Sequence, residues 1–84
     1  MIHRATDSFW RGYHTLPETV QKLAVKNFDL LKSDPRHPSL HFKRVGELWS
    51  VRVGLHHRAL ALGSEDTFDW FWIGDHREYE RLIG

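Results

Sequence analysis

Residues 48–62 show the clearest alternation of apolar and polar side chains in this chain. Large apolar residues take one parity: Trp49, Val51, Val53 and Leu55. The other parity holds smaller or charged residues: Ser50, Arg52 and Gly54. A period of two predicts a half-buried strand whose open face carries Arg52. The chain then turns at His56 and His57, and a second strand returns through Arg58. We therefore predict a hairpin that brings two arginines together and has two histidines at its tip.

Two helices are predicted before this hairpin. Apolar residues spaced near 3.6 indicate a short first helix that begins at Asp7 or Ser8, whose side chains are suitable N-caps. Thr15 followed by Glu18 fits a capping box, which would open a second helix that runs to about Lys32. The short break between the two favours an antiparallel αα hairpin.

The remaining segments complete an α+β domain. We predict a short edge strand within residues 1–6, a strand over residues 40–45, an aromatic strand over residues 68–73 and a helix over residues 76–83. The order is then β-α-α-β-β-β-β-α, in which an antiparallel sheet packs against the N-terminal αα hairpin and a short C-terminal helix follows. The aromatic strand should pair beside the central hairpin. Two aromatic side chains should be mostly buried in the core: Phe28 and Trp49.

Size and composition limit what the chain can be. Its 84 residues are predicted to form one domain, residues 1–84, with a modest core. Cysteine is absent, which excludes disulfides and thiolate metal sites. No apolar run approaches the roughly 20 residues that cross a bilayer, and no signal-peptide pattern is present. A cytoplasmic protein without a membrane partner is therefore expected.

Charge is distributed unevenly although the net charge is only +1. Five arginines or lysines and a single acidic residue fall within residues 36–58. Such a basic segment suits a polyanion, for example nucleic acid. An ordinary solvated face is the alternative interpretation.

A candidate catalytic site is predicted at the start of the last helix. His76 and Tyr79 are three residues apart and share one helix face. If the aromatic strand lies beside the hairpin, both approach Arg52 and Arg58. Two fixed cations, an imidazole and a phenol suit metal-independent RNA cleavage, which requires proton transfer and stabilisation of phosphorane charge. In the structural alternative, His76 caps the helix and Tyr79 packs on the core.

Metal and cofactor sites are not expected. Adjacent His56 and His57 point to opposite sides of an extended chain, and His37 and His41 are separated by Pro38, which prevents helical alignment. No phosphate-binding glycine loop and no nucleophile elbow is present.

The segment order resembles the RelE/ParE superfamily, the toxins of bacterial type II toxin–antitoxin systems. The matching segments cover nearly the whole chain: residues 31–40, 48–54, 57–60 and 72–79. The resemblance implies a small, strongly twisted antiparallel sheet flanked by helices. It also implies a cognate antitoxin, bound in a heteromeric toxin–antitoxin complex through a C-terminal segment that covers the basic groove.

The resemblance further implies an endoribonuclease that cuts mRNA on the ribosome without a metal or cofactor. Arg52 and Arg58 match the positions that bind the scissile phosphate, and His76 and Tyr79 match residues that assist proton transfer. These four are the expected catalytic residues. A second group is expected to contact RNA: Lys43, Arg44, His56 and His57.

The sequence also departs from the RelE pattern. Ser50 and Arg52 stand where RelE-like members often carry two lysines, so His76 would have to act as the base. The superfamily includes ParE-like inhibitors of DNA gyrase and members with little toxicity. Three hypotheses therefore stay open: a ribosome-dependent ribonuclease, a gyrase inhibitor and a non-catalytic antitoxin-binding module.

Overall fold

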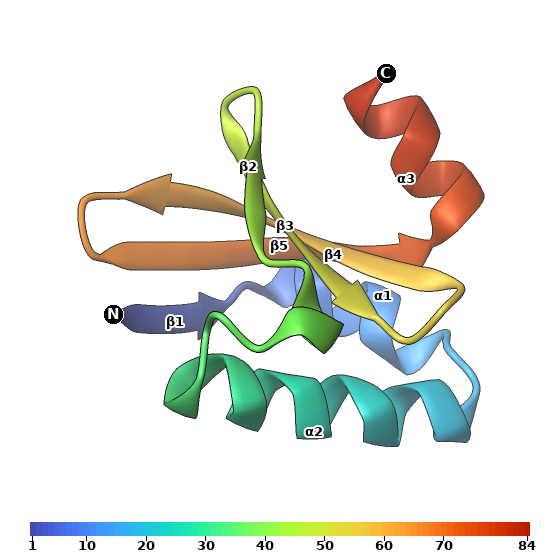
Figure 1. Ribbon diagram of the computed structural model, residues 1–84. Coiled ribbons are helices and arrows are strands. Elements are labelled where there is room, and N and C mark those ends of the chain that lie inside the picture. The colour runs from blue at the N-terminus through green and yellow to red at the C-terminus, as the bar shows by residue number, and fades with distance from the viewer.

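The alternating segment forms the predicted hairpin, β3 (Leu48–Val53) and β4 (His57–Ser64). The computed structural model describes residues 1–84 and contains one five-stranded sheet of order β1-β5-β4-β3-β2 (Figure 1). The aromatic strand, β5 (Thr67–Asp75), pairs antiparallel with β4, as predicted. At one edge, β2 (Lys43–Val45) is antiparallel to β3, whereas at the other β1 (Ile2–Ala5) runs parallel to β5. The predicted element order is confirmed, with one parallel edge pair in an otherwise antiparallel sheet.

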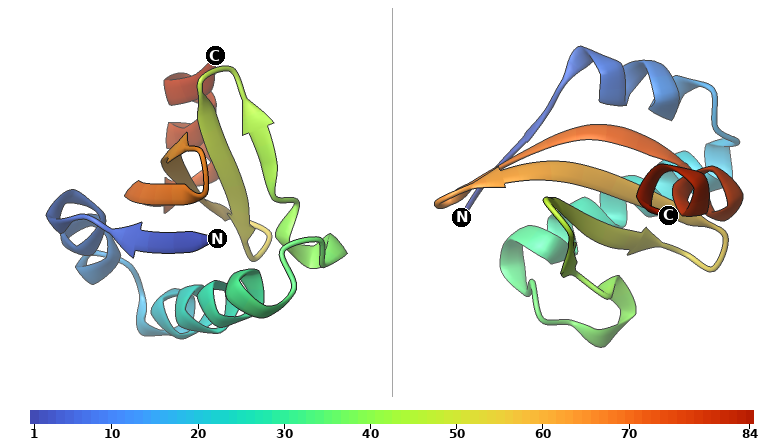
Figure 2. Two further views of the ribbon diagram at one scale, coloured as in Figure 1. Left: turned by 90° about the vertical axis from the view of Figure 1, so that its left-hand side faces the viewer. Right: turned by 90° about the horizontal axis from the view of Figure 1, so that it is seen from above.

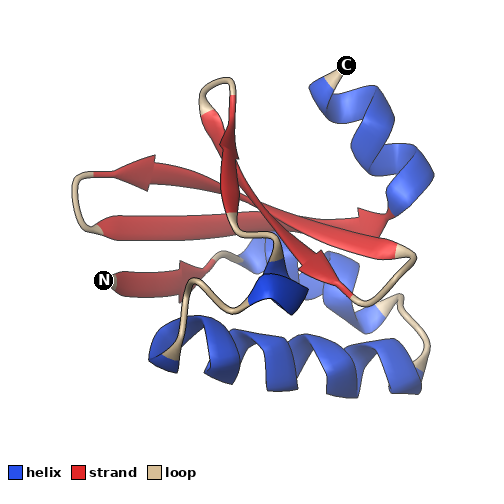
Figure 3. Ribbon diagram, viewed as in Figure 1, coloured by secondary structure: helices blue, strands red, loops and turns tan.

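Helices cover both faces of the sheet. α1 (Asp7–His14) and α2 (Glu18–Ser33) lie on one side, and α3 (His76–Ile83) lies on the other (Figures 1 and 3). The sheet is strongly twisted, so that β2 stands steeply to β5 (Figure 2). The core fills the space between the sheet and the first two helices. Its most buried members include Leu31, Val51, Val53, Ala59, Phe68, Trp70 and Ile73.

The helix caps differ from those predicted. Thr6, and not Asp7 or Ser8, caps α1, because its Oγ1 accepts a hydrogen bond from the amide of Phe9 at 3.3 Å. Thr15 is in the right-handed helical conformation and ends α1, where its Oγ1 donates to the carbonyl of Gly12. An N-cap needs an extended backbone. The predicted capping box is therefore wrong, and α2 begins after Pro17 without a side-chain cap.

Two predicted strand segments have different boundaries in the structure. Residues 38–40 form a short 3₁₀ helix, η1 (Pro38–Leu40), so the strand expected over residues 40–45 is reduced to β2. Gly54 has a φ of +69° and ends β3. The alternation therefore stops before Leu55, which lies in the turn and is 77% exposed.

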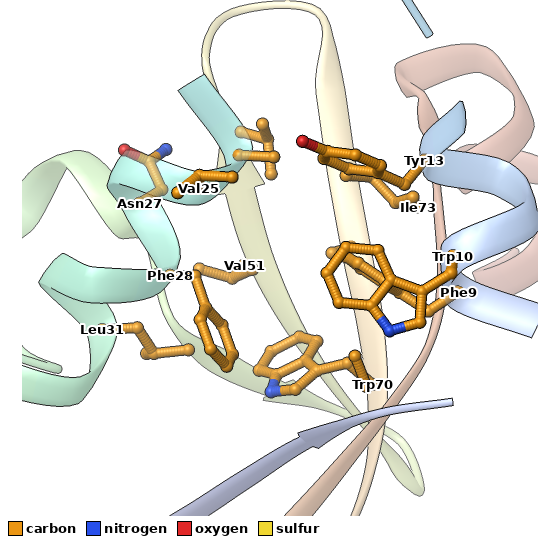
Figure 4. A pocket seen from close by; sticks show the side chains of 14 residues that line it. Phe9, Trp10, Tyr13, Val25, Asn27, Phe28, Leu31, Val51, Trp70 and Ile73 are labelled. Carbon is orange, nitrogen blue, oxygen red and sulfur yellow. The ribbon is translucent and has the colours of Figure 1, made fainter. Parts of the chain in front are cut away.

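An apolar groove separates α1 from α2, and two aromatic residues are less buried than predicted. The groove encloses about 160 Å³ above the sheet, and its lining is almost wholly hydrophobic (Figure 4). Phe28 lines this groove and is half-buried, and Trp49 is half-buried as well, whereas both were expected to be mostly buried. The two helices thus pack on the sheet more than on each other.

His3 is a titratable residue within the aromatic layer. Its ring stacks on Phe68 at a centroid distance of 5.2 Å, and its Nδ1 accepts a hydrogen bond from Trp70 Nε1 at 3.1 Å. Its Nε2 is buried without a partner. Burial lowers the pKa of His3 below its ordinary value of 6.5, and the positive charges of the N-terminus and Lys32 lower it further.

The pKa of His3 predicts how stability depends on pH. The unfolded chain binds a proton at His3 near pH 6.5, whereas the folded chain binds it only at lower pH. The stabilisation is therefore complete above about pH 6.5 and is lost as the pH falls toward the folded pKa. Urea unfolding of His3→Gln should show a smaller loss of stability between neutral and mildly acidic pH. The control is His14→Gln, an exposed histidine on α1, and an equal change in that variant would contradict the assignment.

Candidate active site

Arg52 and Arg58 face each other across the central hairpin. The register of β3 and β4 pairs Arg52 directly with Arg58. Like charges opposite each other in a sheet repel and are destabilising. Burial lowers the pKa of the Arg58 guanidinium below its ordinary value, and the positive charge of Arg52 lowers it further.

No carboxylate lies within salt-bridge distance of either arginine. Arg58 Nη1 donates to the carbonyl oxygens of His57 at 2.8 Å and Gly54 at 3.4 Å, and neither arginine forms a salt bridge. Arg52 Nε is buried and has no hydrogen-bond partner. A buried charged donor without a partner is costly. The pair therefore has no salt bridge of its own, and the negative charge of Glu80 offsets only part of the lowering of the Arg58 pKa.

His76 is the first residue of α3 and lines the same cavity as Arg52 and Arg58. Asp75, and not His76, caps the helix, because its Oδ1 accepts from the amide of Glu78 at 2.9 Å. The amide of His76 donates to the carbonyl of His56 at 2.8 Å and so joins α3 to the hairpin turn. His76 Nε2 lies 3.0 Å from Glu80 Oε1. A carboxylate offers no hydrogen, so Nε2 carries one in this contact and Nδ1 is left for other partners.

Tyr79 is anchored beneath the helix. Its phenol oxygen accepts a hydrogen bond from Ser50 Oγ at 3.0 Å, and Ser50 is 2% exposed rather than on an open face as expected. The Arg58 guanidinium carbon lies 5.9 Å from the Tyr79 ring centroid, and Tyr79 is only 5% exposed. No open ring face is left for an RNA base. This geometry is compatible with an orienting role for Tyr79 and not with stacking on RNA.

A single polar cavity of about 200 Å³ joins these groups. It lies on the α3 side of the sheet and is lined by nine residues, namely His41, Lys43, Ser50, Arg52, Arg58, His76, Tyr79, Glu80 and Ile83. The four residues expected to be catalytic all line it, and so does Lys43. The other three residues expected to contact RNA do not. Arg44 is exposed on β2 and donates from Nε to the carbonyl of Gly46. His56 lies in the hairpin turn, and His57 is the first residue of β4.

Comparison with known proteins identifies the fold. No protein-family model matches the chain, and no characterised protein sequence matches it. Solved structures do match. In the toxin–antitoxin complex RelBE2 of Mycobacterium tuberculosis, a chain with 20% identity superposes with a TM-score of 0.67, over 89% of this chain and 96% of that one. The chain has the RelE/ParE toxin fold.

Two further structures support this fold. The YoeB/ParE toxin of Agrobacterium tumefaciens has 18% identity and a TM-score of 0.67, with 90% of this chain and 99% of that chain covered. A chain of the RelB–RelE antitoxin–toxin complex of Methanococcus jannaschii has 13% identity and a TM-score of 0.70, with 96% and 99% covered. The RelE/ParE fold therefore accounts for nearly the entire length of each chain.

Within the RelE/ParE fold, the cavity contains residues that the sequence reasoning did not select. Glu80 is four residues after His76, and that helical spacing could have revealed it. Ser50 shares the parity of Arg52, but the pattern gave no sign that α3 would bury it. His41 follows a 3₁₀ helix that the pattern did not predict. No three His, Asp or Glu side chains come together as metal ligands, and no helix is long and apolar enough to cross a membrane.

The uncompensated arginine pair predicts stabilisation by simple oxyanions. Inorganic phosphate that binds between Arg52 and Arg58 at ten times its Kd would stabilise the fold by about 1.4 kcal/mol. Thermal unfolding with and without phosphate should show this gain, and Arg58→Gln should lose most of it. Arg11→Gln removes an equal charge from exposed α1 and should keep the gain. Equal gains in both variants would show that phosphate acts through general ionic effects.

Proposed function

We propose that this chain is the toxin of a type II toxin–antitoxin system and that it cleaves mRNA on the ribosome without a metal ion. The observation that carries the proposal is the pair Arg52 and Arg58, which share one cavity with His76 and have no acidic partner of their own. A phosphodiester supplies the missing negative charge. Guanidinium groups bind phosphate through two parallel hydrogen bonds, and imidazole exchanges protons near neutral pH.

Each residue then has a chemical role. Arg52 and Arg58 hold the scissile phosphate and stabilise the charge that develops on its oxygens. His76 exchanges a proton with a reacting oxygen, and Tyr79 orients Arg58 and the phosphate. Lys43 extends the cationic surface along the RNA backbone. Arg44, His56 and His57 lie outside the cavity, where they would contact RNA beyond the scissile bond.

Cleavage of mRNA on programmed ribosomes tests this function directly. Arg58→Gln removes a donor to the transition state and should slow cleavage on the order of 100- to 1000-fold. His76→Asn removes a proton-transfer group and should slow cleavage by about 100- to 10,000-fold. Arg11→Gln, on the opposite face of the sheet, should cleave like the parent chain.

A gyrase supercoiling assay run in parallel separates the alternatives. If the parent chain leaves mRNA intact and blocks supercoiling, the gyrase hypothesis replaces this proposal. If it does neither, the chain is a binding module without catalysis, and the cavity is only an anion-binding surface.

An antitoxin is the proposed protein partner. Two of the compared structures are complexes of RelB-type and RelE-type chains, and this chain shares their fold. An acidic or amphipathic antitoxin segment that enters the polar cavity would neutralise Arg52 and Arg58. Binding of such a disordered segment would be coupled to its folding.

Salt should weaken this antitoxin complex. The Debye length falls from about 10 Å at 0.1 M salt to about 3 Å at 1 M, so charge attraction at the rim of the cavity is screened. Calorimetric titrations over this range should show a rising Kd, with a flatter slope for Lys43→Gln than for the parent chain. An antitoxin that binds only along α1 and α2, and leaves the α3 side of the sheet open, would contradict the neutralisation model.

A further inference from the structure

Cleavage of RNA by its own 2′-hydroxyl needs proton transfer on two sides of the phosphorus. The 2′-oxygen attacks from one side, and the 5′-oxygen leaves from the other, roughly in line. A base is needed at the first oxygen and an acid at the second. His76 stands on one wall of the cavity, where it can serve one of the two oxygens. A second group is therefore sought on the opposite wall.

The fold shows which residues form that opposite wall. α3 packs on β4 and β5 and carries His76, Tyr79 and Glu80. The arginines of β4 and β3 form the floor between the two walls. β2 lies beyond β3 at the edge of the sheet, and α3 and β2 rise apart from each other in Figure 1. The far wall thus consists of His41 and Lys43. Lysine serves as a base mainly where it is buried, and Lys43 is exposed, so the imidazole of His41 is the better group for proton exchange near neutral pH.

The backbone holds His41 in an unusual position. Its φ and ψ are both 44°, in the left-handed region, and Glu65 is the only other non-glycine residue with a positive φ. Leu40 before it is fully buried, and Phe42 after it packs on Trp49 at a centroid distance of 5.1 Å. Two anchored neighbours therefore fix the Cα of His41. Non-glycine residues with strained backbones concentrate at functional sites.

We infer that His41 is the second proton-transfer group of this site and accepts the proton of the 2′-hydroxyl, an assignment that rests on the proposed ribonuclease function. His41 forms no ion pair with a carboxylate and lines the cavity together with Lys43, Arg52 and Arg58, so its ring is free to accept a proton. His76 Nε2 already carries a hydrogen in its contact with Glu80 Oε1, so His76 is placed as the donor. These groups and Glu80 are the charged groups that face His41 across the cavity.

The step balances with these two groups alone. His41 takes the proton from the 2′-hydroxyl as the bond from the 2′-oxygen to phosphorus forms. The bond from phosphorus to the 5′-oxygen breaks, and His76 gives that oxygen a proton. The products are a 2′,3′-cyclic phosphate and a 5′-hydroxyl. No oxidant, reductant or metal enters the balance.

The test uses His41→Asn, because asparagine tolerates the left-handed conformation but does not exchange protons. On programmed ribosomes, this variant should cleave about 100- to 10,000-fold more slowly than the parent chain and should lose the acidic limb of the pH–rate profile. Its thermal unfolding should match that of the parent. His37→Asn is the control in the same loop, since asparagine preserves the N-cap of η1, and it should cleave normally.

A substrate with sulfur in place of the 5′-oxygen separates the acid from the base, because a thiolate leaves without protonation. On this substrate, His76→Asn should recover the rate of the parent chain, whereas His41→Asn should stay slow. Parental cleavage by His41→Asn, or rescue of His41→Asn by the sulfur substrate, overturns the assignment of His41 and leaves the proposed function intact. If the parent chain does not cleave mRNA, the proposed function and this inference both fail.

Discussion

The pairing register of β3 and β4 is the constraint on which this structure depends. It places Arg52 opposite Arg58 on one face and directs Val51 and Ala59 into the core on the other. A slip of one strand by one residue would exchange the two faces of that strand and turn its arginine toward the core. Packing against α1 and α2 therefore holds the register and offsets the repulsion between the guanidinium groups. The face that carries the two arginines is maintained by stability that comes from the opposite face of the same sheet.

α3 both packs on the sheet and forms part of the cavity. It covers Leu60, which is fully buried although it has the parity of Arg58, and it seats Tyr79 against Ser50. The same short helix presents His76 and Glu80 to the cavity. Residues that pack on the sheet and residues that line the cavity thus alternate along this helix. A change that loosens α3 disturbs the position of the imidazole before it affects the rest of the sheet.

The sequence predicted those features that have a regular period. Alternation located the hairpin, and the paired arginines followed from its short turn. The spacing of His76 and Tyr79 placed both on one face of α3. Features that depend on a few backbone angles were not predictable, because a 3₁₀ turn and a left-handed residue leave no periodic signal. His41 belongs to this class.

Local signals also misled where tertiary packing overrode them. Thr15 and Glu18 have the composition of a capping box, but the chain uses Thr15 to close α1 instead. Ser50 has the parity of an exposed residue, yet α3 lies over it. The position of a short helix across a sheet depends on contacts far apart in the chain, and a single sequence shows these poorly. The sequence therefore predicted that the two arginines lie together. It did not predict which residues form the walls of the cavity on either side of them.

The parallel pair of β1 and β5 has a consequence for the order of folding. Its register joins Ile2 to Thr67, so the first strand can pair only after most of this domain has been synthesised. α3, which forms one wall of the cavity, follows β5 in the chain. Such nonlocal contacts make folding slow. A partly synthesised chain that lacks α3 has the two arginines but no imidazole from that helix beside them, so the cavity is completed only when α3 docks on the sheet.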